Sequence, residues 1–363
     1  MNPSHITPVR INEGAWRTIE PYFKPPKEYE NCLHGYKSPL QFYDGTPVKD
    51  KTEWVKRREE IRDKWMDMMG EWPEVIKDQE LEVVSSEHIE NFTRYTVRFR
   101  WLPDEYTTGY LLVPDGDKGD KPAVITVFYE PETAAGIGGK PNRDFAYRLT
   151  KRGFITLSIG TSKTTEDKTY SLYYPNIKNA KVQPLSMLAY AAANAYEALA
   201  KYDGVDADRI GIVGHSYGGK WAMFASCLYE KFAAAVWIDP GIVFDETKGS
   251  NVNYWEPWYL GYYQPPWSKT WSKTSVSGKG LYPTLRKNNF DLHELHALMA
   301  PRPFLVSGGS SDTVDRWIPL NHSIAVNKLL GYSNRVAMSN RPDHSPNPGS
   351  NEIVYSFFEW FLK

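Results

Sequence analysis

A serine lies between glycines near the middle of the chain, in Gly214-His215-Ser216-Tyr217-Gly218. The preceding apolar residues, Ile210–Val213, predict a short buried strand, and a helix is expected to begin near Gly219. On a tight turn between strand and helix a serine hydroxyl projects above the sheet, and the flanking glycines leave room for the close packing of that turn. The five-residue pattern is weak alone, so the interpretation of Ser216 as a nucleophile depends on partners elsewhere.

Suitable partners follow later in the chain. His344 is expected on the last loop before a C-terminal helix that starts near Asn351, and Asp312 follows the predicted strand Pro303–Val306. A neutral imidazole can accept the serine proton near pH 7, and a buried carboxylate fixes the imidazole tautomer. The order Ser216, Asp312, His344 is the order of the nucleophile-elbow hydrolases.

The choice of the acid has alternatives. Asp239 ends the preceding predicted strand, Ala233–Ile238, and is the main alternative acid, whereas Asp315 is a weaker one. The oxyanion of the reaction is expected to be bound by the backbone N–H of Tyr217. A second donor should come from the loop after Ala123–Phe128, which begins at Tyr129.

The other histidines are expected to be structural. His215 adjoins the serine, so its side chain should point elsewhere and serve as a packing or hydrogen-bonded neighbour. His293 and His296 lie on a predicted helix, Asp291–Met299, without the carboxylates or cysteines that would complete a metal site. We therefore expect neither a metal nor an organic cofactor.

These residues need a sheet to position them. A helix is predicted at Thr52–Met69, and the three segments that follow it, Leu81–Ser86, Phe92–Trp101 and Tyr106–Val113, suit antiparallel strands. From Pro122 onward, short apolar strands alternate with helices, which predicts a mostly parallel sheet flanked by helices. We expect an N-terminal arm and helix over residues 1–80 and a catalytic domain over 81–363, with an insert at about 241–290.

Bulk composition excludes some classes of protein. The formal net charge is −1, which offers no basis for electrostatic capture of nucleic acid or of an anionic membrane. Cys32 and Cys227 are the only cysteines, and we expect two free thiols. Without a readable signal peptide in residues 1–10, the protein is expected to be cytoplasmic, or secreted or periplasmic if a leader was removed. Oligomeric state is left open.

The predicted insert is dense in aromatic residues, among them Trp255, Trp258 and Trp267. Such rings can pack on one another as a lid above the nucleophile, or they can line a cleft that binds sugars or aryl groups. Both interpretations stay open.

The chain from about Phe42 onward resembles bacterial carbohydrate esterases of the α/β-hydrolase superfamily, the acetyl xylan esterase and glucuronoyl esterase group. The resemblance rests on Asp44-Gly45-Thr46-Pro47-Val48, on Gly214-His215-Ser216 with Gly219-Lys220, and on Asp291-Leu292-His293-Glu294-Leu295. It implies that Lys220 contacts the sugar. Glucuronoyl esterases usually have an arginine directly after the serine, where this chain has Tyr217.

The leading hypothesis is therefore a serine hydrolase that removes an acetyl ester from a polysaccharide through an acyl-enzyme. The first alternative keeps the same catalytic residues with a glucuronate ester, a peptide or a lactone as substrate. The second alternative, from another class, is a non-catalytic carbohydrate-binding protein built on a hydrolase scaffold.

Overall fold

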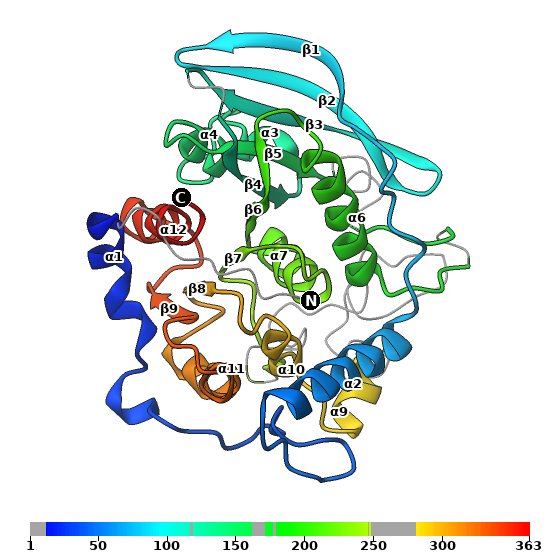
Figure 1. The fold of residues 1–363 in the computed structure, drawn as a ribbon, viewed down its shortest axis with the longest axis vertical. Helices are drawn as coiled ribbons and strands as arrows, with labels where there is room; N and C mark the ends of the chain where they lie inside the picture. Colours follow the sequence, from blue (N-terminus) through cyan, green and yellow to red (C-terminus); the bar gives the residue numbers. More distant parts are fainter. Residues whose placement is uncertain (1–11, 117–118, 162–170, 177–178, 246, 248–280) are drawn as a thin grey trace.

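The computed structural model describes residues 12–116, 119–161, 171–176, 179–245, 247 and 281–363. Its central element is a nine-stranded sheet in the order β1-β2-β3-β5-β4-β6-β7-β8-β9 (Figure 1). The first three strands are antiparallel, whereas β4 to β9 pair in parallel. The expected fold class, a mostly parallel α/β sheet flanked by helices, is confirmed.

The strands lie within a few residues of their predicted positions. Their bounds are β1 Glu82–Ile89, β2 Phe92–Leu102, β3 Glu105–Pro114, β4 Lys121–Phe128, β5 Ile155–Gly160, β6 Val205–His215, β7 Ala234–Ile238, β8 Phe304–Gly308 and β9 Val336–Asn340. Every residue of β5, β7 and β8 is buried, as expected for strands covered on both faces. β1 is exposed along nearly its whole length because it forms one edge of the sheet.

Helices cover both faces of this sheet. The α-helices of the described chain are α1 Glu13–Ile19, α2 Lys51–Met69, α3 Pro131–Ala134, α4 Phe145–Thr150, α6 Pro184–Leu199, α7 Tyr217–Leu228, α9 Tyr282–Lys287, α10 His293–Ala297, α11 Trp317–Leu330 and α12 Pro348–Leu362. Short 3-10 turns occur at Glu20–Phe23, Lys27–Tyr29 and Val314–Arg316. The predicted helices at Thr52–Met69 and Asp291–Met299 correspond to α2 and α10.

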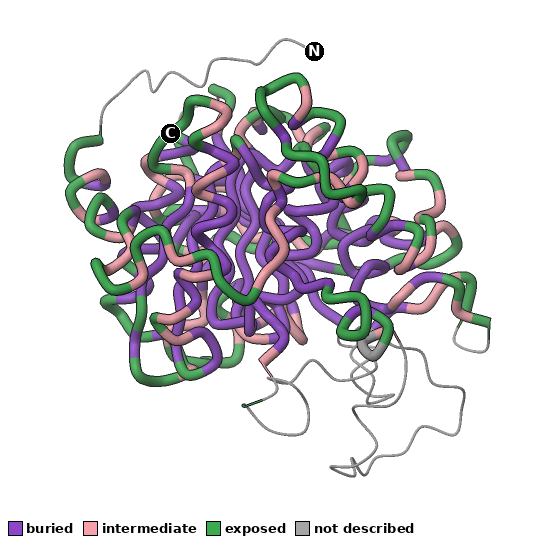
Figure 2. Tube along the Cα trace, turned by 90° about the horizontal axis from the view of Figure 1, so that it is seen from below, coloured by how far each residue is buried: buried purple, intermediate pink, exposed green. Residues whose placement is uncertain are grey.

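Two apolar clusters show which helices share a face. The larger cluster joins α2, α6, α7 and α10 to the sheet, and the second joins α1, α4 and α12 to the opposite face. The buried core runs through the middle of the molecule, with exposed chain around it (Figure 2). Every residue of α6 and of α7 is buried, and the many alanines of α6 permit close packing.

Helix caps explain two boundaries. The Asp50 side chain accepts the Glu53 N–H at 2.9 Å, which begins α2 one residue before the expected position. α12 begins at Pro348 rather than near Asn351, because Asn347 and Ser350 form a reciprocal capping box. The sequence pattern of apolar residues did not include this polar first turn.

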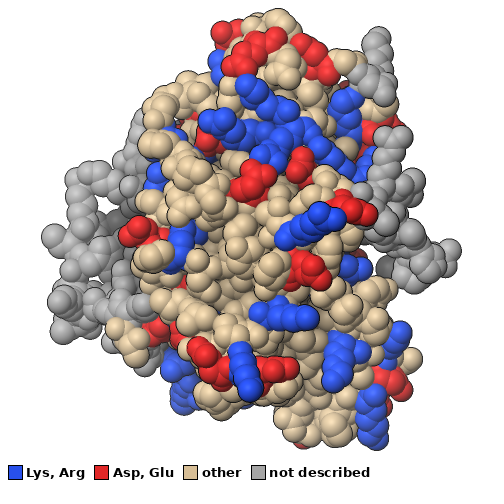
Figure 3. Space-filling view, turned by 90° about the vertical axis from the view of Figure 1, so that its left-hand side faces the viewer, with Lys and Arg blue, Asp and Glu red and all other residues tan. Residues whose placement is uncertain are grey.

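The surface carries both signs of charge. On the face in Figure 3, basic side chains gather in the upper part of the view with acidic side chains beside them. Basic and acidic side chains form ion pairs, such as Arg152 with Glu352 at 2.7 Å and Lys151 with Glu90 at 2.6 Å. No helix in the described ranges has the length and apolarity needed to cross a membrane.

Candidate active site

Ser216 occupies the sharp turn that joins β6 to α7. Its backbone lies at φ 59° and ψ −119°, a strained conformation for a residue with a side chain. A Cβ on Gly214 would come within 2.1 Å of the Gly218 carbonyl oxygen, and one on Gly218 within 2.0 Å of the Val127 oxygen of β4. The two glycines are therefore required by close backbone contacts, and the expected strand-turn-helix context of Ser216 is present.

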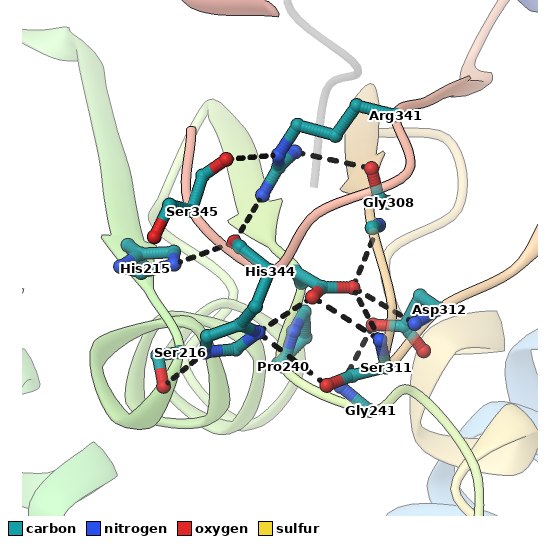
Figure 4. Close-up of polar contacts among 12 residues, drawn as sticks. His215, Ser216, Pro240, Gly241, Gly308, Ser311, Asp312, Arg341, His344 and Ser345 are labelled. Carbon is teal, nitrogen blue, oxygen red and sulfur yellow. Dashed lines mark hydrogen bonds and ion pairs between the residues drawn. The ribbon is translucent and has the colours of Figure 1, made fainter. Parts of the chain in front are cut away.

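His344 lies on the loop between β9 and α12 and bridges two other residues (Figure 4). Its Nε2 is 2.8 Å from Ser216 Oγ, and its Nδ1 is 2.6 Å from Asp239 Oδ2. This arrangement places a nucleophile, a base and an acid in one hydrogen-bonded row. It is the geometry required for a serine activated by an oriented imidazole.

Asp239 directly follows β7 and is fully buried, with its backbone at φ 48°. Its carboxylate accepts the N–H groups of Gly309, Ser311 and Asp312, the first at 2.7 Å. Burial opposes the ionisation of Asp239, but the hydrogen bonds from His344 and from the Asp312 backbone hold its pKa below the ordinary value. The carboxylate is therefore ionised next to the imidazole.

Asp312, the acid expected first from the sequence, contacts backbone N–H groups, and Asp239 takes the place expected for it beside His344. Its two carboxylate oxygens accept the N–H groups of Gly241 and Ile242, each at 2.7 Å, and its own N–H points to Asp239. Burial, together with the negative charge of Asp239, raises the pKa of Asp312 to about 6. The structure thus places the alternative acid, Asp239, against His344, because the loop after β8 presents its backbone to that carboxylate.

Asp315, the weaker candidate, lies farther out. It accepts the Thr313 hydroxyl and pairs with Arg316 at 2.8 Å, while its side chain is 43% exposed. Arg316 also pairs with Asp245 and lies 3.7 Å from Asp312. Asp315 therefore belongs to an ion-pair cluster behind the acid rather than to the row of Ser216, His344 and Asp239.

The two residues expected to supply oxyanion donors, Tyr217 and Tyr129, pack against each other. Tyr217 is the first residue of α7, so its N–H points out of the helix N-terminus, where the helix dipole favours negative charge. The Tyr129 ring stacks on the Tyr217 ring with centroids 4.6 Å apart. The loop after β4 is thereby held next to the turn that carries Ser216.

The side chain of Tyr217 turns away from that anion site. It is fully buried, and its hydroxyl donates to Thr161 Oγ1 at 3.2 Å. Lys220, one helical turn later, is also fully buried, and its ammonium donates to the Pro240 carbonyl. The tryptophans expected to bind substrate, Trp255, Trp258 and Trp267, lie outside the described residues, as does most of the predicted insert.

The two histidines of α10 are buried in the protein interior. His293 and His296 are fully buried on α10, and His293 Nε2 donates to the Lys37 carbonyl at 2.6 Å. Burial lowers the pKa of both histidines, that of His293 to about 3. Among the described residues no group of histidine, cysteine, aspartate and glutamate is arranged to hold a metal ion.

Sequence reasoning did not identify the arginines around the base. Arg341 donates to the His344 carbonyl at 2.7 Å and to the Gly308 carbonyl at 3.0 Å, which ties the histidine loop to β8 (Figure 4). Arg143 donates to Ser345 Oγ at 3.0 Å from the loop before α4. Neither arginine lies in a recognisable sequence motif. Their contacts with the loop that carries His344 become visible only in the folded structure.

Comparisons with known proteins agree with this fold. Residues 191–336 match the model of the prolyl oligopeptidase family. No curated protein matches the sequence.

Solved structures are similar over almost the whole chain. A glucuronoyl esterase from Solibacter usitatus has a TM-score of 0.68 at 20% identity, covering 90% of this chain and 97% of its own. A glucuronoyl esterase from Teredinibacter turnerae has a TM-score of 0.61 at 16% identity, with 91% and 90% covered. A Bacteroides fragilis protein assigned as an acetyl xylan esterase has a TM-score of 0.59 at 16% identity, with 93% and 88% covered. The chain therefore has the α/β-hydrolase fold, and it shares that fold over most of its length with carbohydrate esterases.

Proposed function

We propose that this protein is a serine esterase that hydrolyses a carboxylic ester on a polysaccharide, through an acyl-enzyme on Ser216. The observation that carries the proposal is the position of His344, whose two ring nitrogens lie 2.8 Å from Ser216 Oγ and 2.6 Å from Asp239 Oδ2. A buried carboxylate, an imidazole and a partly buried hydroxyl in this order activate the hydroxyl for attack on an acyl carbon.

In the first half of the reaction, Ser216 Oγ attacks the ester carbonyl while His344 Nε2 accepts its proton. Asp239 accepts a hydrogen bond from the Nδ1–H of His344 and stabilises the imidazolium that forms. The tetrahedral intermediate then collapses, and His344 gives its proton to the leaving sugar oxygen. In the second half, water attacks the acyl-enzyme with His344 again as base, which releases the acid and restores Ser216.

The developing oxyanion is proposed to bind at the N-terminus of α7. The backbone N–H of Tyr217 supplies one donor, and the loop beginning at Tyr129 supplies the second. Removal of one such donor costs roughly 3–4 kcal/mol of transition-state stabilisation. Both donors are backbone groups in this proposal, since the Tyr217 ring is buried against Tyr129.

The substrate class is inferred from the carbohydrate esterases that share the fold. We place an acetyl ester first, because the residue after Ser216 is a buried tyrosine that brings no positive charge to the oxyanion. A glucuronate ester is the second candidate, and it is favoured by the glucuronoyl esterases among the similar structures.

The esterase proposal is tested with p-nitrophenyl acetate and the Ser216→Ala variant. We expect kcat to fall by at least about a thousandfold, because the nucleophile is lost. Ser85→Ala, on the exposed edge strand β1, is the matched control and should keep the wild-type rate. Equal rates in wild type and Ser216→Ala would contradict the proposal.

A substrate panel separates the candidates. We expect acetylated xylan to be hydrolysed with a higher kcat/KM than a methyl glucuronate ester, a peptide amide or a lactone. Preference for the glucuronate ester would reverse the order of the two candidates. Binding of xylan without turnover of any ester would favour the non-catalytic carbohydrate-binding alternative.

A further inference from the structure

The residue before the nucleophile also contacts the loop that carries His344, at its backbone rather than at its side chain. His215 is the last residue of β6, and its side chain is 3% exposed. Its Nε2 lies 3.0 Å from the backbone carbonyl oxygen of His344, and the two imidazole rings have centroids 4.8 Å apart (Figure 4). The strand that delivers the nucleophile therefore also touches the backbone of the base.

The direction of this hydrogen bond follows from the surroundings of the ring. Burial, reinforced by the charge of His344 when protonated, lowers the pKa of His215 to about 3, so the imidazole is neutral at working pH. Arg143 Nε, which can only donate, points to His215 Nδ1 at 3.4 Å. Nδ1 is therefore the acceptor, and Nε2 carries the proton that is donated to the His344 carbonyl.

The loop that carries His344 depends on such tethers. Residues 341–347 form no helix or strand, and the side chain of His344 is 36% exposed. Its carbonyl oxygen receives Arg341 Nη2 from one side, at 2.7 Å, and His215 Nε2 from the other. Arg341 is anchored on β8, whereas His215 is part of β6 itself. Two donors, Arg341 of the loop itself and His215 of β6, thus fix one peptide of an otherwise irregular loop.

We propose that His215 is a positioning residue for the base: its Nε2–H holds the His344 peptide so that the imidazole meets both Ser216 and Asp239. The inference rests on the proposed function, because it concerns how that same catalytic row is kept in register. A displacement of about 1 Å between reacting groups can cost on the order of a hundredfold in rate. Loss of the hydrogen bond from His215 to the His344 carbonyl is therefore expected to lower the reaction rate as well as the stability of the fold.

Two amides of different reach test the role. The amide nitrogen of His215→Gln lies about as far from Cα as the histidine Nε2 does. The amide nitrogen of His215→Asn lies only about as far from Cα as Nδ1. We expect His215→Asn to lower kcat roughly five- to tenfold, as for a lost neutral hydrogen bond, with KM little changed, and His215→Gln to stay within about twofold of wild type. Equal losses in the two variants would overturn the proposal.

The matched control is His322→Asn. His322 is another buried histidine whose Nε2 donates to a backbone carbonyl, that of Leu33, at 3.1 Å in the N-terminal arm. The His322→Asn variant loses a hydrogen bond of the same kind, but at a place that does not contact Ser216, His344 or Asp239. Its kcat should remain that of the wild type, and a loss equal to that of His215→Asn would assign the effect to general destabilisation.

A double-mutant cycle shows whether His215 acts through His344. The readout is the second-order rate at which a fluorophosphonate probe labels Ser216 in wild type, His215→Asn, His344→Ala and the double variant. We expect the His215→Asn loss to disappear in the His344→Ala background. The same fold-loss in both backgrounds would place His215 in the turn of Ser216 instead and overturn the inference.

The probe also keeps the two proposals apart. It reacts with an activated serine whatever the natural ester is. If wild type is not labelled at Ser216, the esterase proposal itself fails. If wild type is labelled and His215→Asn is labelled equally fast, the esterase proposal stands and only the role of His215 is refuted.

Discussion

Asp239 and Asp312 are both buried, and each carboxylate is held by backbone N–H groups from the loop that carries the other residue. Asp239 binds Gly309 and the N–H of Asp312, and Asp312 binds the N–H groups of Gly241 and Ile242. Both residues follow a strand at the same edge of the sheet, so the sequence identified both as candidate acids. The orientation of each side chain is set by the backbone N–H groups that the other loop presents to it. The spacing of residues along the chain does not show how the two loops meet.

This arrangement predicts different losses for the two amide variants. Asp239→Asn should lower kcat on p-nitrophenyl acetate by about 10⁴, because an amide stabilises the wrong tautomer of His344 and not the imidazolium. Asp312→Asn should keep kcat within about tenfold but lower the free energy of unfolding by about 1–3 kcal/mol, since one buried N–H loses its acceptor. Steady-state kinetics and urea denaturation measure both. The reverse order of kcat losses would return the acid role to Asp312.

At the scale of elements, the turn between β6 and α7 combines three close contacts within six residues. A Cβ on Gly214, Gly218 or Gly219 would come within 3.0 Å of a backbone oxygen, and the shortest approach is 2.0 Å, from Gly218 to Val127. The strands and their mostly parallel arrangement were predictable, because short apolar runs that alternate with helical stretches are typical of buried parallel strands. The cap of α12 was not, since it consists of polar residues outside any apolar period.

Gly218→Ala should therefore destabilise the fold and displace Ser216. We expect the free energy of unfolding to fall by about 2–4 kcal/mol, because the backbone of β4 must move, and esterase activity to fall with it. Gly349→Ala is the matched control: its Cβ would lie 3.5 Å from Asn347, an ordinary contact in the first turn of α12. Urea denaturation of both variants is the measurement, and equal stability of the two would contradict the steric explanation.

At the scale of the molecule, a buried ion pair joins the N-terminal region to the body. Arg57 of α2 is 1% exposed, donates to the Pro39 carbonyl at 3.1 Å and lies 3.7 Å from Glu294 of α10. Glu294 also accepts Tyr43 and Trp65 at 3.0 Å each. The sequence was divided at about residue 80, but the segments on either side of this boundary contribute to one buried polar cluster. The sequence pattern predicts individual helices and strands, and it does not show which of them form buried contacts with one another.

Arg57→Met should destabilise this junction in a pH-dependent way. Loss of the cation leaves the buried Glu294 with its two neutral donors but without the compensating charge of Arg57, at a cost of about 3–5 kcal/mol. Burial already raises the pKa of Glu294, and loss of Arg57 raises it further. A carboxyl with a folded pKa above its unfolded value loses stability as pH rises through the folded pKa, so the destabilisation should be greater at pH 8 than at pH 5. Urea denaturation at both pH values tests this, and a pH-independent loss would contradict it.

The contact between α1 and α12 bears on how the chain is made. The Trp16 ring of α1 lies 4.9 Å from that of Trp360, and Phe23, in the 3-10 turn that follows α1, packs edge-on against Phe361. Chains grow from the N-terminus at about 5–20 residues per second, so the apolar side of α1 waits on the order of tens of seconds for its partner helix to emerge. During synthesis this face is an exposed surface that a chaperone can bind, and it is covered only after α12 has left the ribosome.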